Sequence, residues 1–153
     1  RFKGLTVQGL LETAAGRALS FDEMCDLTGK VGLCTMDYID RDVDASLSGG
    51  EIKRVEIASV LARGTRISIF DEPEAGIDLW SFNGLVDVFS ALKQRGTTMV
   101  IISHQQRLLD IADEIIVISS GQLRVQGARD RVMPGLLAGE IAGHCPAGRK
   151  VGA

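Results

Sequence analysis

Apolar residues change their spacing along this chain near residue 46, which divides it into two kinds of pattern. Before that point they recur at helical intervals and form no strand-like run. A short helix is predicted over residues 5–13 and a helical turn over residues 33–38. Ser20 with Glu23 three residues later is a capping box, which predicts another helix between them. We therefore expect residues 1–46 to form a small helical subdomain.

From Ser48 onward, helical patterns alternate with short, almost continuous apolar runs of the kind found in buried strands. The predicted helices run from Ser48 to Gly64, from Asp78 to Gly96, over residues 105–112, and over residues 130–138 with a disturbance at Pro134. The predicted strands are residues 66–70, 97–103, 114–119 and 123–126, and the last two form a hairpin.

Apolar strands separated by helices predict an α/β fold in which a parallel sheet is covered by helices on both faces. Functional sites in such sheets lie beyond the carboxyl ends of the strands. Asp71, Glu72 and His104 each come just after a predicted strand, so we expect them to converge on one edge of the sheet. Residues 47–139 are predicted to form this core, and residues 140–153 a flexible tail.

The segment Leu-Ser-Gly-Gly-Glu at residues 47–51 has the chemistry of an anion site. Ser48 supplies a hydroxyl at a helix start, where backbone N–H groups and the helix dipole attract phosphate. Gly49 and Gly50 lack the Cβ atoms that would hold a phosphate away. The alternative interpretation is an ordinary helix cap with a flexible lead-in.

Two adjacent carboxylates end an apolar run in the string Ile-Phe-Asp-Glu-Pro at residues 69–73. Asp71 suits Mg²⁺ bound through a water, because this ion keeps several of its waters. Glu72 suits polarisation of a water that attacks a γ-phosphate. The alternative for this pair is a polar turn that merely ends the strand. A single histidine such as His104 is in general more often structural than catalytic.

In this order the two strings strongly resemble the signature and Walker B motifs of the ATP-binding-cassette (ABC) ATPases. The resemblance implies a P-loop ATPase fold of the ABC type, with ATP and Mg²⁺ as cofactors. It also implies that Ser48, Gly49, Gly50 and Glu51 bind the γ-phosphate of ATP held by a partner subunit. Two copies would then form a dimer with two shared sites.

Two further features match this family by position. His104 matches the switch histidine, which implies contact with the γ-phosphate and support of the attacking water and Glu72. The loop Ala-Gly-Ile-Asp at residues 75–78 matches the segment that joins the two sites across the dimer. Asp78 is therefore a candidate for the nucleotide site, although it can also be only a helix cap.

The P-loop that this family needs, Gly-x-x-x-x-Gly-Lys-Ser/Thr, does not occur in the sequence. Gly29-Lys30 is the only Gly-Lys pair, and Met24 and Val31 occupy the positions of the first glycine and the hydroxyl residue. In the family the P-loop precedes the helical subdomain, so the resemblance implies the C-terminal part of a cassette. We expect this chain alone to bind ATP weakly or not at all, and a full-length parent to hydrolyse it.

Within the family, the motifs look most like those of SufC-type ATPases of iron–sulfur cluster assembly. The matching features are Glu-Ile-Lys-Arg at residues 51–54 and Glu74 after Asp-Glu-Pro. This resemblance implies a soluble scaffold partner similar to SufB or SufD. One alternative is the motor of a membrane transporter, and another is a truncated, non-hydrolytic module that competes for dimerisation.

Composition limits the remaining possibilities. The 153 residues are 45% apolar and 24% charged, as in an ordinary globular domain. The net charge of −3 gives no basic excess for nucleic acid, and no apolar run is long enough to insert into a membrane. Three cysteines without metal spacing (Cys25, Cys34 and Cys145) indicate reduced thiols in a cytoplasmic protein. His144 next to Cys145 is too small a ligand set to predict a metal site.

Overall fold

The structure, a computed structural model, describes residues 4–139, apart from the side chains of Leu79 and Trp80. The chain divides into two compact units, Arg1–Ser103 and His104–Ala153. The predicted boundary after residue 46 does not coincide with this division and, as a functional boundary, stays a prediction. The predicted flexible tail, with His144 and Cys145, lies outside the described residues. Among the residues described, none of the helices has both the length and the apolar character needed to cross a bilayer.

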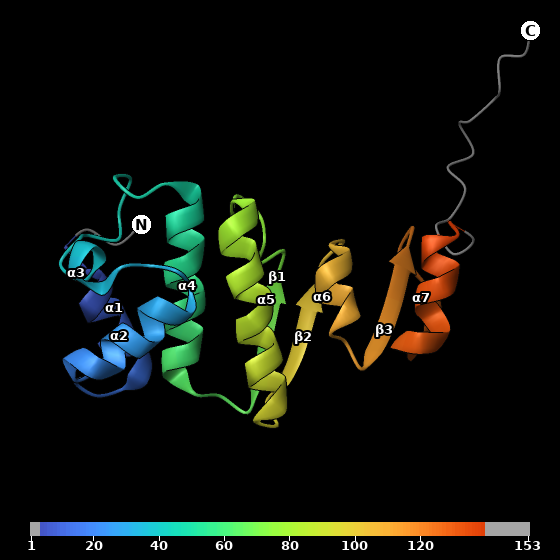
Figure 1. Cartoon of the computed structure of the whole chain (residues 1–153), viewed down its shortest axis with the longest axis horizontal. Coiled ribbons are helices and arrows are strands. Elements are labelled where there is room, and N and C mark those ends of the chain that lie inside the picture. Colours follow the sequence, from blue (N-terminus) through green and yellow to red (C-terminus); the bar gives the residue numbers. More distant parts are fainter. Residues whose placement is uncertain (1–3, 140–153) are drawn as a thin grey trace, which may run out of the picture. The chain divides into compact units, whose positions relative to one another are not determined.

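Four helices form the N-terminal part of the first unit (Figure 1). They are α1 (Val7–Ala15), α2 (Phe21–Lys30), α3 (Thr35–Tyr38) and α4 (Gly49–Arg63). Ser20 and Glu23 form the predicted capping box at the start of α2. Both α1 and α2 pack against α4, and Leu11 of α1 and Val55 of α4 are completely buried. The helices predicted from the local pattern are thereby confirmed.

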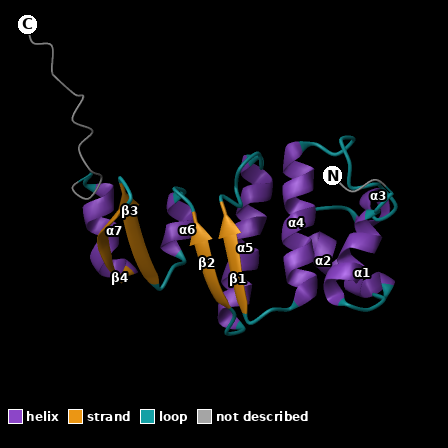
Figure 2. Cartoon of the chain, turned by 180° about the vertical axis from the view of Figure 1, so that it is seen from behind, coloured by secondary structure: helices purple, strands orange, loops and turns teal. Residues whose placement is uncertain are grey.

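Two parallel strands follow α4 (Figure 2). They are β1 (Ile67–Asp71) and β2 (Thr98–Ile102), joined by α5 (Leu79–Gln94). The register places Asp71 opposite Ile102. On the buried face, the ring of Phe70 lies 4.8 Å from the ring of Phe89 in α5, measured between centroids. The predicted fold class is therefore confirmed, with a small parallel sheet and flanking helices.

The other face of this sheet is exposed, contrary to the predicted coverage of both faces. Its large apolar side chains are β-branched and between 50% and 69% exposed, namely Ile67, Ile69, Val100 and Ile102. Side chains alternate between the faces of a strand, so Ile67 and Ile69 share one side of β1. The continuous apolar runs predicted burial on both sides, but the described residues provide helix cover on one side only.

The second unit contains an antiparallel hairpin of β3 (Glu114–Ser119) and β4 (Gln122–Ala128). The helix α6 (Gln106–Asp110) precedes the hairpin, and α7 (Arg129–Leu137) follows it. Ser120 and Gly121 both have positive φ, 53° and 71°, as a two-residue hairpin turn requires. The hairpin is as predicted. The helix predicted here is confirmed, and α7 continues through Pro134, whose carbonyl accepts from the Ala138 N–H. Proline has no N–H to donate, so the predicted disturbance is limited to one missing hydrogen bond and does not end the helix.

Candidate functional site

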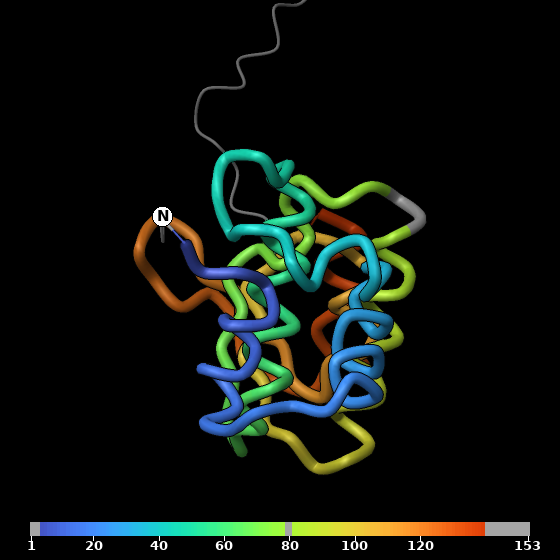
Figure 3. The backbone as a smooth tube through the Cα atoms, turned by 90° about the vertical axis from the view of Figure 1, so that its left-hand side faces the viewer, coloured from blue at the N-terminus to red at the C-terminus, as the bar shows by residue number. Residues whose placement is uncertain are grey.

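The start of α4 and the carboxyl ends of β1 and β2 lie at the same end of the first unit (Figure 1; Figure 3). One hydrogen bond joins the helix to the strand, since Lys53 Nζ donates to the Asp71 carbonyl oxygen over 3.2 Å. The fold of this unit therefore brings the predicted anion segment and the predicted acidic pair to one end of the sheet.

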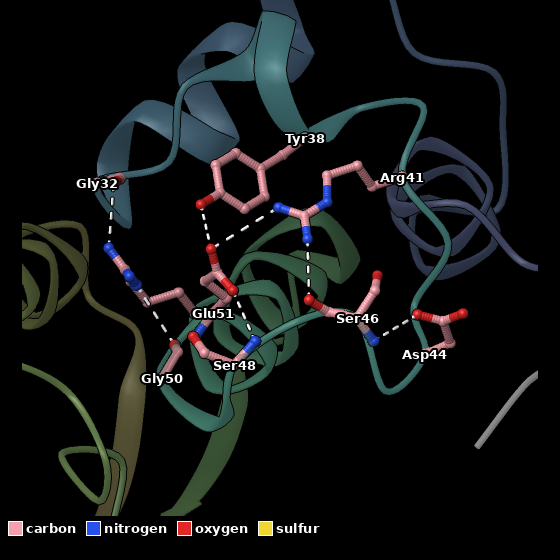
Figure 4. Close-up of polar contacts among 9 residues, drawn as sticks. Gly32, Tyr38, Arg41, Asp44, Ser46, Ser48, Gly50 and Glu51 are labelled. Atoms are coloured by element: carbon pink, nitrogen blue, oxygen red, sulfur yellow. Dashed lines mark hydrogen bonds and ion pairs between the residues drawn. The ribbon is translucent and has the colours of Figure 1, made fainter.

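Ser48 is held at the start of α4 by two reciprocal hydrogen bonds (Figure 4). Its Oγ accepts from the Glu51 N–H over 3.3 Å, and its own N–H donates to Glu51 Oε2 over 2.6 Å. Ser48 and Gly49 are both exposed. The predicted helix cap is confirmed, and the first turn of α4 presents the positive end of the helix dipole at the surface.

The carboxylate of Glu51 is also fixed by the last residue of α3 and by the loop that follows α3 (Figure 4). The Tyr38 hydroxyl donates to Glu51 Oε1, and Arg41 Nη1 lies 3.8 Å from the same oxygen. The hydrogen bond from Tyr38, followed by those from Ser48, lowers the pKa of Glu51 from 4.5 to about 2. The bond to Glu51 in turn raises the pKa of Tyr38. The Glu51 carboxylate holds Ser48 in place and, being ionised, repels phosphate at short range. The predicted contact of Glu51 with a γ-phosphate stays a prediction.

The two glycines of the segment, Gly49 and Gly50, differ in their surroundings. A Cβ atom added at Gly49 would meet nothing within 4 Å. A Cβ atom at Gly50 would collide with the carbonyl oxygen of Gly76 and lie 3.8 Å from the Cα of Ile77. The sequence suggested that both glycines make room for a phosphate. At Gly50, the loop 75–78 comes so close that a side chain would not fit, which explains this glycine without a phosphate.

Asp71 and Glu72 are exposed at the end of β1. The Glu72 N–H donates to the Ile102 carbonyl of β2 over 2.9 Å. Glu72 has a φ of +43°, a left-handed conformation that costs an L-residue about 1–3 kcal/mol. Strained residues of this kind are concentrated at functional sites, where the surrounding structure holds them. The predicted role of Glu72 in the chemistry stays a prediction.

Asp78 is the cap of α5. Its Oδ1 accepts from the Ser81 N–H over 3.0 Å, and its Oδ2 accepts from the Ser81 hydroxyl over 2.7 Å. The capping interpretation is thus confirmed. The role of Asp78 at a site shared across a dimer stays a prediction.

Sequence reasoning missed Arg54, which connects three segments near this site. Its guanidinium donates to the carbonyl oxygens of Gly50 and Gly32 and to the Ser81 hydroxyl, at 3.1–3.3 Å. The available signal was its spacing of four residues from Gly50, which places both on one side of α4. Tyr38 was missed as well, and no local pattern in the sequence pointed to it.

His104 is the first residue of the second unit and comes two positions after Ile102, the strand partner of Asp71. Its predicted convergence with Asp71 and Glu72 stays a prediction.

The described residues contain no group of three or more His, Cys, Asp or Glu side chains that could hold a metal alone. Asp71 still fits Mg²⁺, because this ion keeps most of its waters and takes one or two carboxylates besides substrate phosphates. The exposed first turn of α4 likewise fits a phosphate group. These residues therefore fit Mg²⁺ and ATP as parts of a site.

Comparison with known proteins agrees with this geometry. Residues 7–75 match the family model described as ABC transporter. An uncharacterized ABC transporter ATP-binding protein of Methanocaldococcus jannaschii is 33% identical over 133 residues, which are 83% of this chain and 53% of the relative. The chain carries part of an ATP-binding cassette domain. An energy-coupling factor transporter ATP-binding protein of Mycoplasmoides gallisepticum is 40% identical over 82 residues, 53% of this chain and 26% of that protein. The cassette domain here spans about half the length of the first relative and less of the second.

Solved structures show the same fold for the partial cassette domain. The dimeric structure of a bacterial ABC transporter cassette matches with a TM-score of 0.72 at 20% identity, over 84% of this chain and 58% of that one. A bacterial Atm1-family ABC exporter with ATP bound matches with a TM-score of 0.75 at 25% identity, over 90% of this chain and 26% of that one. The Gly29-Lys30 pair lies inside α2, so it does not form a phosphate-binding loop in this domain.

Proposed function

We propose that this chain is the part of an ABC ATPase that presents a signature helix to one nucleotide and an acidic strand end to another. The main support is the placement of the α4 N-terminus at the same end of one unit as Asp71 and Glu72, with Lys53 linking helix and strand. Phosphoryl transfer needs both elements, namely N–H donors for the γ-phosphate and carboxylates for the ion and the attacking water.

In this proposal each residue either binds the phosphate or the ion, or orients and polarises the attacking water. Ser48 and the first N–H groups of α4 bind the γ-phosphate oxygens of a nucleotide held by the partner copy, and Glu51 keeps Ser48 in position. Asp71 would hold Mg²⁺ through a water, and the ion when bound neutralises charge on the phosphates. Glu72 orients the attacking water and accepts its proton, while His104 steadies the same water.

Shared sites make this proposal testable by mixing variants. In a cassette-length protein that contains this chain, Ser48→Arg blocks the phosphate pocket and Asp71→Asn removes the carboxylate for the ion. Each pure variant is expected to lose hydrolysis. In an equal mixture, half of the dimers combine both variants and keep one intact site of two, so about a quarter of the activity returns. Dimers that form without recovery, or pure variants with normal turnover, contradict shared sites.

Asp78 is proposed to lie at the junction of the two sites.

For the whole protein, we propose the ATP-driven subunit of a membrane transporter. The relatives named above are described as transporter ATP-binding proteins, and the ABC exporter of similar fold was solved with ATP bound. This assignment predicts that the native protein, solubilised in mild detergent, copurifies with a permease that has several apolar spans. Its ATPase activity should rise when that permease is present.

A SufC-like ATPase of iron–sulfur cluster assembly is the second candidate. The Glu-Ile-Lys-Arg string at 51–54 and Glu74 support it, whereas none of the relatives named here is described in that way. The partner separates the two functions, because cluster assembly needs a scaffold similar to SufB or SufD that copurifies without detergent. Mass spectrometry of the tagged native complex, prepared with and without membranes, distinguishes a scaffold from a permease.

A further inference from the structure

Glu74 is a buried carboxylate that the function proposed above does not use. It is 9% exposed, and the neighbouring Pro73 is completely buried. Its Oε1 accepts a hydrogen bond from the Ser103 hydroxyl, while Oε2 is buried without a hydrogen-bond partner in the part of the chain that the structure describes. A carboxylate buried with one oxygen unpaired costs stability instead of supplying it. Its presence therefore needs a reason other than stability.

The place of Glu74 in the fold supplies such a reason. Two hydrogen bonds join the turn at residues 72–74 to the end of β2. The Glu72 N–H donates to the Ile102 carbonyl, and the Ser103 hydroxyl donates to the Glu74 carboxylate. The first bond holds Glu72 by its main chain in the left-handed conformation, and the second holds the same turn two residues further on. Loss of the second bond would let the turn relax its strain and carry the Glu72 side chain away.

We propose that Glu74 is a positioning residue, whose hydrogen bond with Ser103 fixes the turn that aims Glu72 at the attacking water. This inference rests on the proposed ATPase function. Glu74 itself contacts no reacting atom in the scheme. Ser103 directly precedes His104 in the chain, so the same hydrogen bond ties the turn of Glu72 to the segment that continues into His104.

Two matched variants separate the hydrogen bond from the charge. Glu74→Gln removes the charge but keeps an oxygen that accepts from Ser103. Glu74→Asp keeps the charge but is one methylene shorter and loses the bond, as does Ser103→Ala. In a cassette-length protein, Glu74→Asp and Ser103→Ala are each expected to lower kcat about tenfold, with KM for ATP changed less than about twofold, because small misplacements of a reacting group are costly. Glu74→Gln should stay within about threefold of the wild type.

The double variant Glu74→Asp/Ser103→Ala should be no slower than either single variant, because both changes remove the same bond. The turn can also be followed in this chain itself by amide hydrogen exchange. The N–H groups of Ala75 and Ile77 donate to the carbonyls of Glu72 and Glu74. Their exchange should be faster in Glu74→Asp and Ser103→Ala than in Glu74→Gln and the wild type.

Three results would overturn the inference. They are normal kcat in Glu74→Asp, equal impairment in Glu74→Gln and Glu74→Asp, and effects that multiply in the double variant. An inactive wild-type cassette would instead contradict the ATPase function. In that case equal exchange rates at residues 75 and 77 in all four proteins would show that Glu74 does not position the turn.

Discussion

The carbonyl oxygen of Gly76 occupies the space that a Cβ atom of Gly50 would need. At this contact, the first turn of α4 lies against the loop 75–78, which leads into α5. Both segments belong to motifs that indicate phosphate chemistry, and they meet backbone to backbone. A change in one segment is therefore expected to displace the other.

Gly50→Ala is expected to lower the free energy of unfolding of this chain by about 1–3 kcal/mol, because the new Cβ forces α4 or the loop to move. Gly49→Ala is the matched control in the same helical turn, where the Cβ has open space. It should be neutral or stabilising by up to about 1 kcal/mol, since alanine favours helix over glycine. Urea unfolding of both variants checks this, and equal losses would contradict the steric explanation.

Glu51 is expected to make stability depend on pH in the acid range. Its pKa is about 2 in the folded chain against an ordinary 4.5. A lowered carboxyl pKa contributes stability above the ordinary value, and this contribution disappears as pH falls from about 4.5 towards 2. Glu51→Gln keeps the helix cap but not the charge, so it should be less stable than the wild type at pH 6 and match it near pH 2. Glu23, whose pKa is also about 2, titrates in both proteins and cancels.

Tyr38 controls this titration, because its hydroxyl is the largest cause of the lowered pKa of Glu51. Tyr38→Phe should therefore move the pKa of Glu51 back towards 4.5, as measured by NMR titration of the side-chain carboxyl. An unchanged Glu51 pKa in that variant would contradict the assigned hydrogen bond.

Arg54→Ala is expected to lower the free energy of unfolding by about 1–2 kcal/mol, because three hydrogen bonds to Gly50, Gly32 and Ser81 are lost. Arg54→Lys should recover little of this loss, since an ammonium group lacks the planar fork that reaches several acceptors at once. Thermal unfolding of the two variants beside the wild type provides the measurement. Full recovery by lysine would show that charge matters more than geometry.

Glu72→Gln in a cassette-length protein is expected to lower kcat by about 10²- to 10⁴-fold, because the amide no longer accepts a proton from the attacking water. ATP binding should persist, and the ATP-bound dimer should accumulate. Phosphate release and light scattering measure the two effects. Glu56→Gln, at an exposed position of α4, is the control with the same chemical change. Unchanged turnover in Glu72→Gln would remove this residue from its role.

The sequence predicted the features that depend on near neighbours. The capping box of Ser20 and Glu23, the cap at Ser48 and the cap at Asp78 each involve residues only three positions apart, so short-range preferences decide them. The contacts that complete the site join distant residues. Tyr38 and Glu51 are 13 positions apart, and Glu74 and Ser103 are 29 apart. Only tertiary packing brings these pairs together, and no periodicity encodes it.

The sheet also shows a limit of prediction from the sequence. The apolar runs at residues 66–70 and 97–103 predicted the two strands correctly, but the cover that they predicted on both faces is present on one face only. Hydropathy records that a side chain avoids water, whereas the covering element is set by the arrangement of the rest of the chain.

In the proposed ATPase, the left-handed backbone of Glu72 lowers thermal stability at a residue that turnover needs. Glycine adopts this conformation without strain, so a glycine at position 72 should raise the melting temperature while removing the acid. A library sorted for survival at high temperature would then drift towards glycine here, and one sorted for phosphate release would retain glutamate. Glycine at position 72 in one population and glutamate in the other would show that glutamate is retained there for activity, at the expense of stability.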